Sequence, residues 1–208
     1  MPKLADHEQR RAQITDALLR VVAAQGLHAV TMRGVAQEAG VSLRLVQYYF
    51  ETKERLLFHA VEHVGALLAG RLTARLRALG EDPGHRLVIE TIVAEALPTD
   101  DDSRMLHIVY TSYAVLAMTA PELAGERFLR NPTALEDYLA GRFTAAAEAG
   151  ELADGADPRA EAAALMGLYG GLGTSVLLEQ RTVEAATVVI GYHLDRVFRP
   201  ASRRGTRA

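Results

Sequence analysis

The sequence contains no cysteine and no tryptophan, and only 6% of its residues are aromatic. Without cysteine the chain can form no disulfide, no thiolate metal site and no cysteine nucleophile, which suits a reducing compartment. A large excess of one charge is also absent, since 23 basic and 26 acidic side chains leave a formal net charge of −3. The hydrophobic fraction of 49% is ordinary for a globular protein and excludes a disordered or fibrous chain.

Long hydrophobic runs are absent as well. Two uncharged runs, residues 105–121 and 162–178, have 17 residues each, whereas a membrane span needs about 20. We interpret both runs as buried helices. The first eleven residues contain no apolar segment of the kind that a secretory signal requires. We therefore expect a soluble, cytoplasmic protein with no membrane partner.

Good helix formers dominate what is present, because alanine and leucine supply 63 of the 208 residues. Helix breakers recur at helix-length intervals and no stretch alternates with a period of two, which predicts an all-α fold. We expect Asp6 to cap the first helix and Gly26 to end it. The later helices are expected at 32–39, 43–49, 53–79, 84–97, 102–119, 121–130, 132–149, 158–179 and 182–198.

Two of the short helices have the spacing of a helix-turn-helix. Thr31 is placed to cap the first, Gly40 ends it, and Ser42 caps the second. Thr52 then caps a long fourth helix of about 27 residues, which is about 40 Å at 1.5 Å per residue. This arrangement predicts a small amino-terminal head joined by a rigid helix to a helical body.

The distribution of charge supports a contact with nucleic acid at one end. Residues 1–55 carry a net charge of +2, and residues 56–208 carry −5. A basic head on an acidic body suits a polyanionic partner at the head. We expect a DNA-binding domain over 1–52, an effector-binding and dimerisation domain over 53–199, and a disordered basic tail over 200–208.

The segment Thr31–Lys53, followed by Glu54-Arg-Leu-Leu57, resembles the amino-terminal signature of the tetracycline-repressor (TetR) family of transcriptional regulators. The threonine, Val-Ala in the first motif helix, Ala-Gly-Val-Ser at the turn, Tyr-Phe and the lysine all occur in register. The resemblance covers roughly residues 10–57, and the stretch from Leu97 to Met118 resembles the betaine-regulator-like branch. It implies a homodimeric, ligand-responsive regulator of transcription, most often a repressor.

A helix of this motif enters the major groove, where each base pair presents a distinct pattern of groups. The first turn of helix 43–49 then presents four side chains to the bases. Arg44 can donate a fork to guanine, Gln47 can pair with adenine, and Leu43 and Leu45 suit thymine methyl groups. The family commonly has other residues at these positions, and a tyrosine in place of Gln47, so the operator is not transferable. The resemblance adds Arg33 as a base or phosphate contact.

The resemblance also places four side chains against the DNA backbone, and we add the serine at the turn. These contacts position the protein without specifying sequence. For each residue singly, an ordinary surface side chain remains an equal alternative. The expected backbone contacts are Thr31, Ser42, Tyr48, Tyr49 and Lys53.

Two local patterns resemble metal sites. His59-Ala-Val-Glu-His63 fits the H-x-x-E-H pattern of zinc peptidases, but it lacks a motif for a third ligand, so we predict no catalytic metal, no cofactor and no enzymatic activity. A regulatory metal at His59 and His63 stays an alternative. The acidic run Asp100–Asp102 precedes a predicted helix and is interpreted as a cap rather than a calcium site.

The apolar helix 102–119 carries polar side chains where core residues are expected. These side chains either bond to one another or belong to an effector pocket, since buried polar groups need partners. The family resemblance favours a pocket for an unidentified small molecule. The candidate lining residues are Met105, His107, Tyr110, Tyr113, Met118, Phe128, Phe143, Met166 and Tyr169.

The last two predicted helices have two apolar faces each, which is more than the edge of a monomer should expose. A second subunit is the simplest cover, and it would place two heads on a pseudo-palindromic operator. The expected interface residues are Ala163, Gly167, Gly171, Thr174, Val188, Val189 and Tyr192. The rival hypothesis is a helical small-molecule-binding protein or enzyme that has kept a redundant head.

Overall fold

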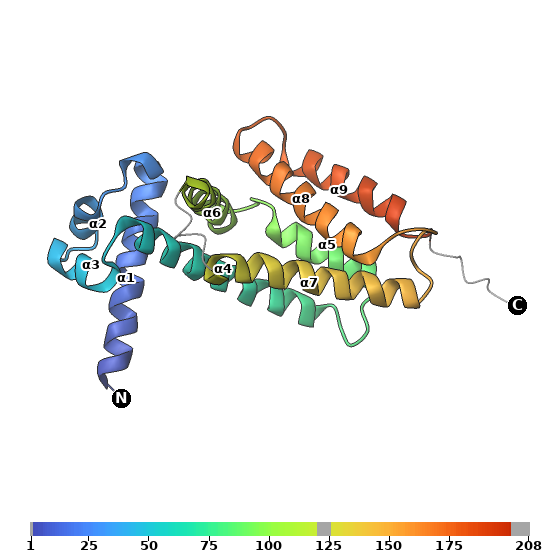
Figure 1. Ribbon diagram of the computed structural model, residues 1–208, viewed down its shortest axis with the longest axis horizontal. Coiled ribbons are helices and arrows are strands. Elements are labelled where there is room, and N and C mark those ends of the chain that lie inside the picture. The colour runs from blue at the N-terminus through green and yellow to red at the C-terminus, as the bar shows by residue number, and fades with distance from the viewer. Residues whose placement is uncertain (1, 120–125, 201–208) are drawn as a thin grey trace, which may run out of the picture. The chain divides into compact units, whose positions relative to one another are not determined.

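The computed structural model describes the backbone of residues 2–119 and 126–200 and the side chains of residues 7–118 and 132–200. Every regular element in these ranges is helical, apart from one isolated bridge between Leu152 and Phe198, which confirms the all-α class. Within the same ranges we find no helix with the length and hydropathy of a membrane span. The elements are α1 (Pro2–Gln25), the 3-10 helix η1 (Leu27–Ala29), α2 (Met32–Glu38), α3 (Leu43–Phe50), α4 (Lys53–Ala78), α5 (His85–Ala96), α6 (Asp101–Thr119), α7 (Glu126–Glu148), α8 (Pro158–Leu177) and α9 (Val183–Val197) (Figure 1).

The chain folds as two compact units. Unit 1 consists of Met1–Arg71 and Asp100–Phe128, and unit 2 consists of Leu72–Thr99 and Leu129–Ala208. The helix α4 is continuous and contributes to both units. This division differs from the sequence-based boundary at residue 53, because the first half of α4 packs into the core of unit 1.

The core of unit 1 forms on the apolar face of α1. Ile14 and Leu18 are completely buried there. Val35 from α2, Phe50 from α3 and Leu56 from α4 pack into the same cluster. Burial of each large apolar side chain contributes about 1.5–3 kcal/mol, so this cluster holds α2 and α3 in place against α1 and α4.

The predicted start of the first helix is wrong, although its end is confirmed. α1 begins at Pro2, so Asp6 lies inside the helix rather than at its cap. Proline is favoured in the first turn of a helix, and no breaker separates it from Asp6. At the other end α1 stops at Gln25, and Gly26 has φ of 78°, a conformation that suits glycine.

The predicted break at Asn131-Pro132 is also wrong. α7 runs from Glu126 to Glu148 with Pro132 inside it. An internal proline removes one helical hydrogen bond and costs about 3 kcal/mol. Leu139 and Phe143 on the same helix are completely buried in unit 2, and their burial offsets a cost of that size. The predicted break at Pro121 lies outside the described residues, as do residues 201–208 of the expected tail.

Asp100 caps α6, as predicted for the acidic run, and Asp101 and Asp102 lie in the first turn of the helix. The Ser103 amide donates to Asp100 Oδ1 at 2.9 Å, and the Asp100 amide donates to Ser103 Oγ at 3.1 Å, which is a reciprocal cap. The Arg71 guanidinium also donates to the Asp100 carboxylate. Arg71 first, and then Ser103, hold the pKa of Asp100 well below its usual range.

We expect Asp100→Ala to lower the free energy of unfolding by about 1 kcal/mol at neutral pH, because the cap and a half-exposed ion pair are both lost. The pKa of Asp100 is lower in the folded chain than its unfolded value of about 3.9, so the stabilisation is present above that value and declines as the pH falls through it. Urea unfolding measures the free energy of unfolding of the wild type and of Asp100→Ala, and the difference between the two values should become smaller from pH 5 to pH 3. Asp82→Ala, in an exposed turn, is the control. A difference that does not change with pH would contradict this role.

Candidate nucleic-acid interface

The turn between α2 and α3 is fixed by local hydrogen bonds. Thr31 Oγ1 accepts from the Gly34 amide at 3.0 Å, and Ser42 Oγ accepts from the Leu45 amide at 3.2 Å, so both predicted caps are present. Gly40 has φ of 67°, which a residue with a Cβ rarely adopts. Gln13 on α1 donates to the Ala39 carbonyl at 2.9 Å. The turn that leads into α3 is therefore anchored to α1.

α3 has one buried and one exposed face. Val46 and Phe50 are buried in the core of unit 1, while Arg44 and Gln47 are exposed. Tyr48 retains 67% of its accessible surface. The helix thus presents its polar residues on the face that a DNA groove would meet, and this face is built from its first two turns.

The two leucines of α3, which we expect to contact bases, are half-buried. Leu43 packs against the core of unit 1, so part of its surface has a structural role. Leu45 is half-buried and is not a member of that cluster. Leu45 is therefore the better candidate of the two for an apolar contact with a base.

The charges around α3 leave three cations without acidic partners. Glu38 pairs with Arg20 at 2.6 Å, and Glu51 pairs with Arg55. Among the described side chains, no ion pair involves Arg33, Arg44 or Lys53. Since Glu38 and Glu51 already have basic partners, neither of them neutralises these three cations, which are available to a polyanion.

The hydroxyls and rings of the head have further contacts. Since the hydroxyls of Thr31 and Ser42 accept hydrogen bonds from backbone amides as caps, each hydroxyl proton remains available to a phosphate oxygen.

Tyr49 is half-buried and its ring lies 4.5 Å from the ring of His7 on α1. His7 also lies 6.1 Å from Tyr48. Sequence reasoning missed His7, since no local pattern joins it to tyrosines forty residues away.

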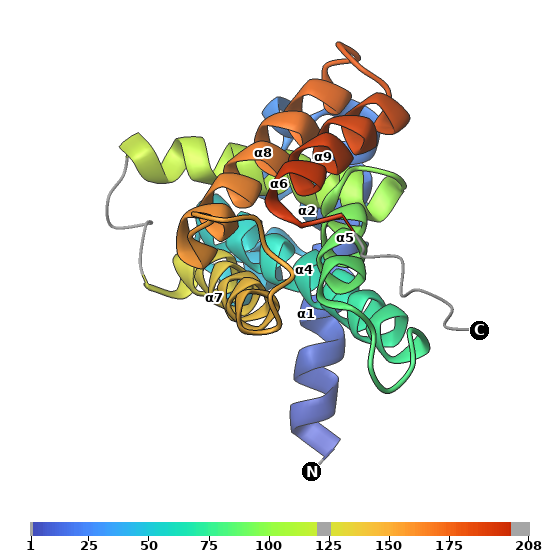
Figure 2. The ribbon, with the colours of Figure 1, turned by 90° about the vertical axis from the view of Figure 1, so that its right-hand side faces the viewer.

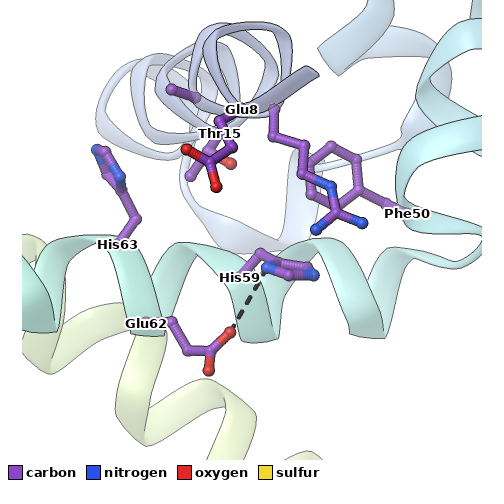
Figure 3. Close-up of a pocket in the computed structure, with 8 residues that line it drawn as sticks. Glu8, Thr15, Phe50, His59, Glu62 and His63 are labelled. Atoms are coloured by element: carbon purple, nitrogen blue, oxygen red, sulfur yellow. Dashed lines mark ion pairs between the residues drawn. The ribbon is translucent and has the colours of Figure 1, made fainter. Parts of the chain in front are cut away.

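Figure 3 shows the H-x-x-E-H residues at a pocket of unit 1. His59 Nδ1 lies 3.5 Å from Glu62, and its ring packs 5.2 Å from the ring of Phe50. His63 Nε2 instead lies 3.3 Å from Asp16 on α1. The two imidazoles therefore have different carboxylate partners. In the described part of the chain no group of three or more His, Asp or Glu residues is arranged to hold a metal ion.

In unit 2, the small residues of α8 that we expect at a subunit interface are exposed. Gly167 and Gly171 are exposed, whereas Leu165 and Leu172 on the other face are buried. Figures 1 and 2 both show α9 beside α8. On α9 the exposed fractions of Val188 and Tyr192 are 70% and 63%, while Val189 packs against the core of unit 2. Ala163 and Thr174 are exposed with the glycines.

The candidate effector residues divide between the two units. On α6, Tyr113 is buried beside Phe58 and Met118 is 79% exposed. Burial raises the pKa of both Tyr110 and Tyr113. In unit 2, Phe143 is completely buried. Met105, His107 and Tyr110 are half-buried in unit 1, Met166 and Tyr169 are half-buried in unit 2, and the side chain of Phe128 lies outside the described residues.

Comparison with known proteins covers both parts of the chain. The profile of bacterial regulatory proteins of the tetR family matches residues 14–60, and that of the carboxyl-terminal part of BetI-type transcriptional repressors matches residues 85–199. The regulator PksA of Bacillus subtilis is 33% identical over 118 residues, 55% of this chain and 56% of PksA. The regulator BetI of Paraburkholderia phytofirmans is 32% identical over 146 residues, 70% of this chain and 73% of BetI.

A transcriptional regulator of Saccharomonospora viridis, solved in complex with choline, has the same fold. Its TM-score is 0.74 at 22% identity, and the match covers 93% of this chain and all of that one. The match with PksA spans little more than half of that protein's length. The two profiles together span most of the residues that the structure describes.

Proposed function

The chain belongs to the tetR family of bacterial regulatory proteins, and from this premise we propose that it is a ligand-responsive repressor that binds a pseudo-palindromic operator as a homodimer. The observation that carries the proposal is the capped helix α3, with Arg44 and Gln47 exposed and no described acidic side chain paired with Arg44. An exposed, capped helix of this polarity suits the major groove.

Base and backbone contacts have separate roles in this proposal. Leu43, Arg44, Leu45 and Gln47 read bases. Thr31, Ser42, Tyr48, Tyr49 and Lys53 hold the phosphates, and Arg33 reaches either. With two heads on one operator, the α3 helices would be spaced about 34–36 Å apart, one turn of DNA.

The effector would act by differential affinity. A small molecule weakens operator binding only if it binds better to the conformation that fits DNA less well. We propose that α4, a single helix contributing to both units, carries this coupling. The candidate residues on α6, α7 and α8 stay a prediction for its site.

The experiment that tests the function is selection of bound fragments from the source genome, with no small molecule present and at modest ionic strength. We expect a small set of duplexes with an inverted repeat, bound at least a thousandfold more tightly than random DNA. The rival hypothesis, a small-molecule-binding protein or enzyme with a redundant head, predicts no enrichment. A purified protein that binds no genomic duplex above random DNA would contradict our proposal.

Lys53→Ala should weaken binding to operator and random DNA by similar factors. Lys53 lies at the amino terminus of α4, where it can contact phosphate but not bases. The slope of log affinity against log salt concentration should fall by about one for each subunit bound. Fluorescence anisotropy over a salt series measures both quantities. Loss confined to the operator would instead place this lysine against a base.

A further inference from the structure

A second small-molecule site is suggested by a pocket of about 350 Å³ in unit 2, where α4 turns into α5 and faces α7. Its main lining residues are Leu76, Arg77, Pro83, Val88, Tyr138 and Arg142. We propose that this pocket binds a small organic anion, with one carboxylate or phosphate group on a short apolar body. None of the candidate effector residues lines it, and the proposal does not depend on the DNA-binding function.

Two arginines supply the charge of this pocket. Arg77 is exposed in the last turn of α4, and Arg142 is half-buried on α7. Neither forms an ion pair with any described side chain. The acids nearest to Arg77 in sequence, Glu81 and Asp82, are exposed in the intervening turn, and the acid nearest to Arg142, Asp137, lies 3.7 Å from Arg159. The positive charge of the pocket is therefore not neutralised from within.

Arg142 has hydrogen-bonding capacity that the described chain does not use. Its Nε is buried and has no hydrogen-bond partner among the described residues. Within the same part of the chain, its Nη2 donates only to the Pro83 carbonyl, over 3.5 Å. A buried donor without an acceptor costs about 1–3 kcal/mol. Because Nε is shielded even from a water molecule, an oxyanion in the pocket would accept hydrogen bonds from the Nη groups of the guanidinium instead.

The adjoining end of α5 adds positive potential. Gly84, at the cap position, provides no side-chain cap, and the first turn contains no acidic residue. The free amides of that turn thus keep their partial positive charge. Pro83, which precedes the cap residue Gly84, and Val88, the fourth residue of α5, both line the pocket. The carboxyl end of α4 has a partial negative charge that disfavours an anion. Arg77 lies in the last turn of this helix and supplies the opposite charge there.

The remaining wall is apolar, which defines the rest of the ligand. Leu76, Pro83 and Val88 present aliphatic surface, and the ring of Tyr138 is half exposed with a hydroxyl that can donate. A volume of about 350 Å³ lies within the range of small-molecule sites. A bare inorganic ion would leave this apolar surface uncovered, so we expect an amphipathic anion.

Calorimetry on the full-length protein separates the parts of the proposal, with hexanoate, hexyl phosphate, 1-hexanol and inorganic phosphate as probes. We expect at least one hexyl anion to bind at least tenfold more tightly than both hexanol and inorganic phosphate, and the better anion identifies the head group. Hexanol binding as tightly as both anions would overturn the role of the arginines. If inorganic phosphate binds as tightly as both hexyl anions, the proposed role of the apolar wall would be overturned.

Substitutions locate the site. Arg77→Gln and Arg142→Gln should each weaken the better anion at least tenfold. Arg104→Gln, which removes the same charge from an exposed position on α6, should leave its affinity unchanged. Because Arg142 is half-buried, Arg77→Gln on the exposed helix end keeps the test valid if Arg142→Gln does not fold. Unchanged affinity in Arg77→Gln would overturn the proposal, while operator binding without the anion reports separately on the regulator function.

Discussion

Arg44→Ala is expected to weaken operator binding by about 1–3 kcal/mol for each half-site, which is roughly a factor of 5 to 150. Arg44 is the second residue of α3, is exposed, and has no ion pair among the described side chains. Its guanidinium can donate two parallel hydrogen bonds to O6 and N7 of one guanine. Alanine removes both bonds and leaves the acceptors of that base unpaired.

The loss should be specific to one base pair. Competition with operators changed at single positions should show that the variant no longer discriminates at the position that Arg44 reads, while discrimination elsewhere is retained. Arg104→Ala, at an exposed site of unit 1 on α6, removes the same charge and controls for long-range electrostatics. Equal losses on operator and random DNA would show that Arg44 contacts phosphate instead.

The same substitution should leave the fold intact. The side chain of Arg44 is exposed and forms no hydrogen bond in the described structure, so the free energy of unfolding should change by no more than about 0.5 kcal/mol. Thermal unfolding of the variant is therefore a direct check that a loss of DNA binding arises at the interface. The effect on DNA binding can be separated from the effect on stability because the core residues of α3, Val46 and Phe50, lie on the opposite face of the helix.

The sequence predicted the head well because its determinants are local. Thr31 and Ser42 cap helices through hydrogen bonds to amides three residues ahead, so the residue type and spacing are sufficient evidence. The burial of Val46 and Phe50 follows from helical periodicity in the same way. Where both signals agree, as in α2 and α3, the predicted bounds differ from the structure by at most one residue.

Features that depend on tertiary packing were not accessible from the sequence. Pro132 is a local breaker, but α7 continues through it while its later turns are buried in unit 2. The partners of His59 and His63 are decided by which helix lies opposite, not by their spacing. Arg77 and Arg142 are far apart in sequence, so nothing local marks the pocket that they share.

Gly171→Leu should separate the dimer while leaving the subunit folded. A Cβ added at Gly171 or Gly167 meets no other heavy atom within 4 Å in the single chain, so a larger side chain there has room. Glycine inside a helix is about 1 kcal/mol less favourable than alanine, so leucine should stabilise α8 in the isolated subunit. An exposed stripe of glycines on a helix is thus costly for the subunit alone, and it suits close approach of another backbone.

The neighbouring helix strengthens this expectation. Val188 and Tyr192 on α9 are mostly exposed, and α9 lies beside α8 (Figure 2), so we expect a second copy of the chain to cover the exposed residues of both helices. A leucine at 171 would hold the two copies apart, so we expect the dimer dissociation constant to rise at least a hundredfold. Gly171→Ala, which adds a single methyl group, should have an intermediate effect.

Sedimentation over a range of concentrations measures the dissociation, and operator binding reports its consequence. A monomer can contact only one half-site, so specific binding should fall steeply although α3 is unaltered. Gly141→Leu, at an exposed position on α7 where a Cβ also meets nothing within 4 Å, should remain dimeric and bind operator as the wild type does. A Gly171→Leu protein with wild-type dimer affinity would place the subunit interface away from α8.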